Sequence, residues 1–119
     1  MRYLTFVRGR EDQGAPPPAL EEAMGKFIAE SLADGSLVQT GGLSRYPDAV
    51  LLRIAKGKLS VTDGPFAEAK EVIGGYAIIE AKSKADAIRI CTRFMQLHSQ
   101  HWPEWEGEGE VRQLDFVVP

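Results

Sequence analysis

Arg2–Arg8 reads RYLTFVR, a run rich in β-branched and aromatic residues that predicts a β-strand. Side chains alternate along a strand, so this one has two apolar faces, Leu4 and Phe6 on one and Tyr3, Thr5 and Val7 on the other. We therefore expect both faces of the strand to be covered.

Two helices are expected outside this strand. A proline-rich connector, Gly9–Pro18, leads into apolar residues that recur at helical spacing from Leu20 to Leu32. Asp34-Gly35 should end this helix, because glycine accepts the left-handed conformation that follows a last turn. Ser83 and Asp86 have the spacing of a helix N-cap with an acidic partner. The second helix then has the apolar stripe Ala87, Ile88, Cys91, Phe94 and Met95.

The remaining β-structure is expected in three places. Ala49–Ile54 alternates and can turn at Lys56-Gly57 into Lys58–Thr62, which predicts a hairpin. Val72–Ala81 predicts a further strand, and Glu110–Val118 predicts the last one. The expected order is β-α-β-β-β-α-β.

Apart from the inserted hairpin strand, this order is typical of an α+β, ferredoxin-like split β-α-β domain. In that fold two helices cover one face of an antiparallel sheet. We expect a second subunit to cover the other face about a two-fold axis, which predicts a homodimer. The length of 119 residues suits a single domain spanning residues 1–119.

Composition narrows the function classes. The chain is 44% hydrophobic and 26% charged, with a formal net charge of -3 and no basic cluster, so nucleic-acid binding is not expected. A single cysteine, Cys91, cannot form a disulfide within the chain. There is no leader and no long apolar run, so we expect a cytoplasmic protein without a membrane partner.

The most distinctive motif is Val61–Glu71, which reads VTDGPFAEAKE and is followed by Ile73-Gly74-Gly75-Tyr76. Asp63 can accept hydrogen bonds from nearby amides, and Gly64 and Pro65 favour a fixed turn. Phe66 can anchor this turn in the core. The motif would hold one carboxylate in a defined place at a strand end.

These residues resemble the YCII-related family, and specifically its DGPF branch, named after the tetrapeptide Asp63-Gly64-Pro65-Phe66. The resemblance also includes Tyr3-Leu4, the first-helix residues Met24, Lys26 and Phe27, the turn Gly41-Gly42-Leu43, and Glu110-Val111-Arg112. It implies a dimeric α+β barrel of ferredoxin-like subunits. It also permits a regulatory partner, since DGPF relatives often occur beside sigma factors of the extracytoplasmic class.

The resemblance bears on catalysis as well. Relatives of the short YCII type are thought to use a first-helix histidine and a nearby aspartate as an acid/base pair. The histidine position falls near Met24 here, and the first helix contains no histidine. Asp63 is the counterpart of the aspartate.

Three residues are candidates for catalysis. Asp63 could transfer protons or simply cap its own turn. His98 and His101 lie three residues apart near the end of the second helix, where they could act in acid/base chemistry, bind a ligand, or be structural. No third ligand accompanies them, so no metal site is predicted, and no cofactor is expected.

Five residues are candidates for ligand binding. Tyr3, Arg53, Tyr76 and Arg112 lie in expected strands, where the arginines could hold a carboxylate or phosphate, or merely form ion pairs at the sheet edge. Trp102, like Trp105, could cover a site or anchor an interface. Two functions remain open: a small-molecule-binding or regulatory homodimer, or a non-redox enzyme that uses Asp63 on a small metabolite.

Overall fold

The computed structural model describes residues 1–44, 46–64 and 72–118, which form an α+β fold. Its helices are α1 (Pro18–Asp34) and α2 (Lys84–His101). Its strands are β1 (Arg2–Gly9), β2 (Leu37–Gly42), β3 (Val50–Ala55), β4 (Lys58–Asp63), β5 (Val72–Glu80) and β6 (Gly107–Gln113). Two short 3₁₀ turns lie at Glu11–Gln13 and Tyr46–Asp48.

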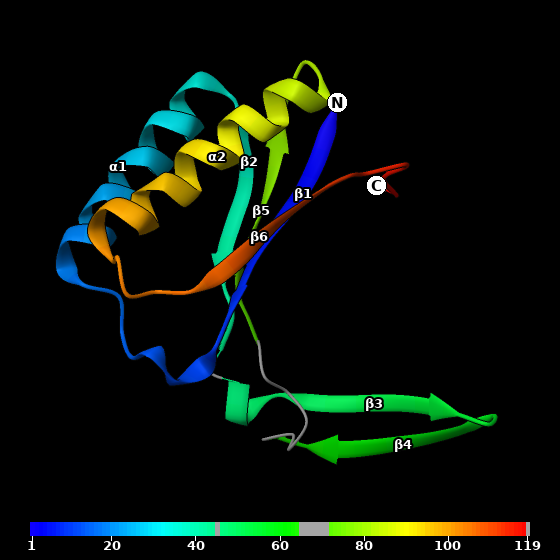
Figure 1. Cartoon of the computed structure of the whole chain (residues 1–119). Coiled ribbons are helices and arrows are strands. Elements are labelled where there is room, and N and C mark those ends of the chain that lie inside the picture. Colours follow the sequence, from blue (N-terminus) through cyan, green and yellow to red (C-terminus); the bar gives the residue numbers. More distant parts are fainter. Residues whose placement is uncertain (45, 65–71, 119) are drawn as a thin grey trace.

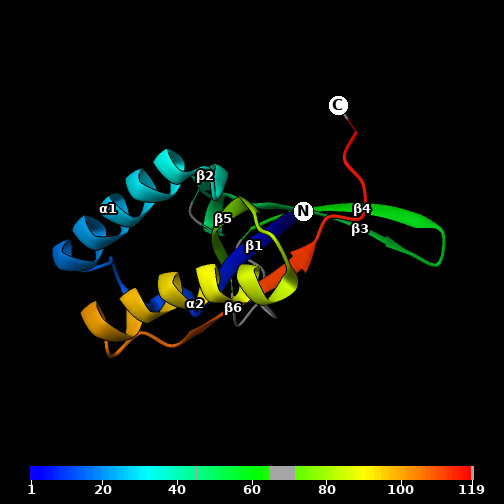
Figure 2. The same cartoon turned by 90° about the horizontal axis from the view of Figure 1, so that it is seen from above.

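The main sheet has four antiparallel strands in the order β2-β5-β1-β6. This is the strand order of a ferredoxin-like split β-α-β domain. Both helices lie on one side of the sheet, as Figures 1 and 2 show from two directions. The fold class expected from the sequence is confirmed at this level.

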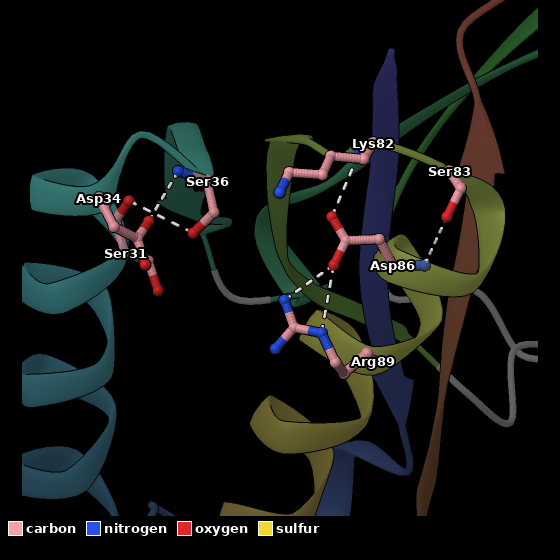
Figure 3. Close-up of polar contacts among 7 residues, drawn as sticks. All are labelled: Ser31, Asp34, Ser36, Lys82, Ser83, Asp86 and Arg89. Carbon is pink, nitrogen blue, oxygen red and sulfur yellow. Dashed lines mark hydrogen bonds and ion pairs between the residues drawn. The ribbon is translucent and has the colours of Figure 1, made fainter.

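The helix ends follow from local chemistry. Proline occupies the first turn of α1, and Gly35 ends the helix in the left-handed conformation, with φ of 83°. Ser83 caps α2 by accepting a hydrogen bond from the Asp86 amide at 3.1 Å, while the Asp86 carboxylate accepts one from the Lys82 amide at 3.0 Å (Figure 3). Both predicted helix ends are confirmed.

The two faces of the sheet differ. Tyr3 and its cross-strand neighbour Ile79 face the helices and join the core, which also contains Leu37, Ala81, Ala87 and Ile90. Alternation turns the next residues to the opposite side. We call this side the open face; its half-buried apolar residues are Leu4, Phe6, Tyr76 and Ile78.

One strand was missing from the expected order. Leu37–Gly42 forms β2, which pairs with β5, whereas its Gly41-Gly42 pair suggested only a turn. A glycine suits this position of the strand because a Cβ at Gly41 would lie 2.9 Å from the Tyr76 ring. The fourth strand of the ferredoxin-like sheet is therefore β2, and the expected order β-α-β-β-β-α-β was one strand short.

The last strand is shifted from its expected range. β6 covers Gly107–Gln113 instead of Glu110–Val118 because it follows β1, pairing from Gly9↔Gly107 to Tyr3↔Gln113. The Leu114 amide donates the last hydrogen bond, to the Arg2 carbonyl at 2.9 Å. Beyond that point β1 offers no further partner, and the chain leaves the sheet.

The predicted hairpin is confirmed, but it forms a sheet of its own. Strands β3 and β4 pair with each other around a turn at Lys56 and Gly57, where both φ angles are positive. Figures 1 and 2 show this hairpin extending away from the helices. The later part of the sequence motif, residues 65–71, lies outside the described residues.

Candidate functional site

A large cavity lies between the helices and the sheet. Its volume is about 1600 Å³, and its lining comes from both helices and all four strands of the main sheet. It exists because α1 supplies no residue to the buried core cluster; only Phe27 and Ile28 of α1 pack against that cluster. The space exceeds the roughly 300–1000 Å³ of ordinary small-molecule pockets.

The cavity wall is mainly apolar. It includes Met24 and Phe27 of α1 and Phe94 and Met95 of α2, and the Phe27 and Phe94 rings contact each other. Its polar residues include Thr5, Ser31, Cys91 and His98. Apart from His98, which can be protonated, the only charged side chains among the described lining residues are those of Arg10 and Asp12. Both are exposed, and Nε of Arg10 lies 3.4 Å from Oδ1 of Asp12. Such a wall suits an uncharged, apolar molecule.

His98 is the most buried titratable group of this wall, with 8% of its surface exposed. Its Nδ1 lies 3.3 Å from the Phe94 carbonyl oxygen. Because a carbonyl can only accept, Nδ1 carries the proton and Nε2 of the neutral ring is an acceptor. Among the described residues, no polar side-chain atom is both fully buried and without a hydrogen-bond partner. Since only Nδ1 of His98 has such a partner, Nε2 is not fully buried.

A row of aromatic rings extends from α1 to the loop after α2. The centroid distances are 6.1 Å for Phe27–Phe94, 5.1 Å for Phe94–His98, 4.7 Å for His98–Trp105 and 6.3 Å for Trp105–Trp102. The Trp102 amide caps α2 through the His98 carbonyl at 2.8 Å, and the Trp105 amide donates to the Trp102 carbonyl at 3.0 Å. These bonds fold the loop back so that Trp105 covers His98.

Burial shifts two pKa values at the cavity. Desolvation lowers the pKa of His98, and its hydrogen bond to the Phe94 carbonyl only partly opposes that effect. Desolvation raises the pKa of the Cys91 thiol, against a smaller effect of the Thr5 hydroxyl. Both side chains are therefore favoured in their neutral forms, which agrees with the apolar wall.

The remaining predicted site residues lie elsewhere. Tyr3 is in the core, and His101 is the last residue of α2 and does not line the large cavity. Arg112 lies on the open face and is 3.9 Å from Glu110. Tyr76 is on the same face, although part of it reaches the large cavity.

Two candidates lie in the hairpin. Asp63 ends β4 and is exposed, and Arg53 of β3 is exposed as well. The amide after Asp63, that of Gly64, donates to the Ala49 carbonyl at 2.7 Å and closes the base of the hairpin. The structure thus brings His98 and Trp102 together, but it separates both from Asp63.

Sequence reasoning missed part of this site. Phe27 and Phe94 were assigned to apolar helix stripes, and Trp105 was expected only as a cover or an interface anchor, not as a ligand-binding residue. The sequence feature that could have indicated the position of Trp105 is Gly107, because a Cβ at this residue would lie 2.3 Å from the Trp105 ring. A glycine two residues after a tryptophan leaves room for the ring to fold back.

Among the described residues, no group of three or more His, Cys, Asp or Glu side chains is arranged to hold a metal ion. Within the same residues, neither helix combines the length and the apolar character needed to cross a membrane.

Comparison with known proteins gives one family match. The model of the YCII-related domain matches residues 1–99. No curated protein matches the chain. Among solved structures, the chain is similar to the de novo designed protein Foldit4, with 11% identity, a TM-score of 0.48, and coverage of 96% of this chain and 99% of that one.

Proposed function

The chain belongs to the YCII-related family, and from this starting point we propose that it is a homodimeric binding protein for an uncharged, apolar small molecule. The observation that carries the proposal is the cavity of about 1600 Å³ between the helices and the sheet. Apolar burial supplies the affinity, and one acceptor, Nε2 of His98, gives orientation. An aromatic ligand fits best because the row of rings lines one end.

The dimer rests on the open face. Leu4, Phe6, Tyr76 and Ile78 cover the centre of this face, and no helix of the described chain lies over them. A single layer of helices leaves such a surface in water, and a second copy removes it from water. The dimeric α+β barrel, in which a second copy covers the open face, is the arrangement we propose.

Further assignments follow the sequence resemblance. Asp63-Gly64-Pro65-Phe66 supports placing the chain in the DGPF branch, as one domain over residues 1–119. With that branch comes a regulatory role beside an extracytoplasmic-class sigma factor. Ligand binding would then alter contact with this partner in the cytoplasm.

The alternative is an enzyme in which Asp63 transfers protons, assisted by His98 or His101. Asp63 does not line the large cavity and is exposed at the end of β4. A substrate of Asp63 would therefore have to bind outside the cavity described here. Binding without chemistry is the better supported function.

A neutral aromatic probe, N-phenyl-1-naphthylamine, tests the cavity. Its fluorescence should rise on titration with the protein, with a dissociation constant of about 10 μM or below, as expected for a largely buried ligand of this size. Bound probe should also slow alkylation of Cys91, which lines the same cavity. No saturable fluorescence change up to about 1 mM protein would reject the site.

A pair of variants on α1 places the probe. Met24→Trp should fill part of the cavity and weaken probe binding at least tenfold, whereas Glu22→Trp adds the same ring at an exposed position that does not line the cavity. Equal affinities of the two variants would mean that the probe binds elsewhere. Light scattering at micromolar concentration tests the dimer separately.

A further inference from the structure

The hairpin of β3 and β4 has one apolar face. Its register pairs Leu52 with Val61 and Ile54 with Leu59, so these side chains lie on the same side as Val50, whose partner at the base of the hairpin is Asp63. All five are large aliphatic residues that are 51% to 75% exposed. We call this surface the arm face.

The other face of the hairpin is polar. Arg53 pairs with Ser60, and Leu51 pairs with Thr62, on the side turned away from the arm face. An isolated two-stranded hairpin is marginally stable in water, so an apolar face on it needs a cover. The hairpin does not pair with the main sheet, and the exposure of its five aliphatic side chains shows that the described part of the chain does not cover them.

The same chain carries a matching surface. The open face is apolar at Leu4, Phe6, Tyr76 and Ile78, and the hairpin extends from the sheet away from the helices, toward the side of that face (Figures 1 and 2). Because the hairpin points outward, arm face and open face do not meet within one copy. A two-fold axis would bring the arm of each copy to the sheet of the other.

We propose that the β3–β4 hairpin is an exchanged arm, whose arm face packs on the open face of a second copy of this chain. The inference rests on the proposed homodimer and specifies how it is held. Two arms and two open faces enter one isologous interface, so each contact occurs twice.

Leu52→Glu tests the arm, with Ser60→Glu as its control. Both changes add one carboxylate at the middle of the hairpin, the first on the arm face and the second on the polar face. Leu52→Glu should raise the dimer dissociation constant roughly a hundredfold or more, because two leucines and two charges enter the symmetric interface. Ser60→Glu should raise it less than about threefold.

Ile78→Glu tests the acceptor, and circular dichroism checks that this variant folds. Alone it should weaken the dimer as Leu52→Glu does. Mixed with Leu52→Glu, it should form heterodimers, because one intact arm then meets one intact open face. Sedimentation velocity on the wild type, the single variants and the mixture measures all of these.

The outcomes separate the two proposals. A monomeric wild type would overturn the homodimer and the arm together. A dimeric wild type with an equally stable Leu52→Glu dimer would overturn the arm alone. A Leu52→Glu monomer beside a normal, folded Ile78→Glu dimer would show arms packing on each other, which also overturns the proposed acceptor. If Ile78→Glu does not fold, Leu4→Gln on the same face replaces it under the same criteria.

Discussion

The imidazole ring of His98 lies 4.7 Å from the indole ring of Trp105, at an interplanar angle of 41°. Trp105 belongs to the loop after α2, so this contact joins the end of the helix to the beginning of β6. It covers one side of the most buried titratable group in the cavity wall. The protonation of His98 is therefore linked to the packing of the loop.

Stability should fall as the pH is lowered through the range where His98 titrates. Burial lowers the pKa of His98 in the folded protein from its ordinary value of 6.5. Below that pH the unfolded chain binds more protons than the folded one, so acid favours unfolding. Above it His98 is neutral in both states, and the protein has its full stability. Melting temperatures between pH 5 and pH 7.5 should show this loss.

Two variants identify the histidine responsible. His98→Phe keeps a ring in the aromatic row but cannot be protonated, so its melting temperature should change less between pH 7.5 and pH 5. His101→Gln removes the chain's other histidine and should keep the wild-type slope. If His98→Phe has the wild-type slope, the link between His98 and stability is wrong.

Gly107→Ala should destabilise the loop after α2. A Cβ at Gly107 would lie 2.3 Å from the Trp105 ring and 2.6 Å from the Arg8 carbonyl oxygen, which belongs to the backbone of a central strand. We expect a loss of about 1–3 kcal/mol in the free energy of unfolding, measured in urea, and a change in tryptophan fluorescence.

Gly25→Ala is the matched control for Gly107→Ala. Gly25 lies within α1, and a Cβ there would meet no atom within 4 Å. The same chemical change should stabilise the protein by about 0.5–1 kcal/mol, because glycine is a poor helix former. Equal effects of the two substitutions would contradict the packing of Trp105 on Gly107.

Local signals in the sequence predicted the elements that local chemistry controls. Ser83 and Asp86 marked the beginning of α2, and Gly35 marked the end of α1. The strand β2 was not predicted because its glycines suggest a turn. The need for a glycine at position 41 becomes clear only from the Tyr76 ring of the neighbouring strand. The extent of β6 likewise depends on where β1 ends, a relationship between residues about a hundred positions apart.

The candidate site was less predictable for the same reason. His98 could be singled out by residue type, but its burial depends on Trp105 and on hydrogen bonds that return the loop to the helix. The cavity itself results from the spacing between α1 and the sheet, which no local pattern encodes. Asp63 was conspicuous in its motif, yet the separate hairpin sheet carries it away from the cavity.

Ser83→Ala should cost about 0.5–2 kcal/mol by removing the cap of α2. The hydroxyl satisfies the Asp86 amide, which has no partner within the first turn of the helix. Ser99→Ala, near the other end of α2, removes an exposed hydroxyl that bonds only the Gln96 carbonyl and should be nearly neutral. Urea unfolding of both variants measures the difference; indistinguishable midpoints would show that the cap contributes nothing.

Asp63→Asn separates the binding protein from the enzyme. Asparagine keeps the shape and the hydrogen-bonding oxygen of the side chain while removing the charge, so we expect a change in unfolding free energy of about 0–1 kcal/mol. Affinity for N-phenyl-1-naphthylamine should be unchanged, because Asp63 does not line the cavity.

An acid/base role for Asp63 predicts another result. Metabolite screening with the wild type would reveal a substrate, and its turnover by Asp63→Asn would fall by roughly a hundredfold or more, the usual scale of a lost proton-transfer group. Since the melting temperature should barely move, such a loss could not be attributed to unfolding. If the wild type turns over a substrate and Asp63→Asn shows this loss, the protein is an enzyme, and binding without chemistry is contradicted. If the wild type and Asp63→Asn turn the substrate over equally across the pH range, Asp63 is not a catalytic group.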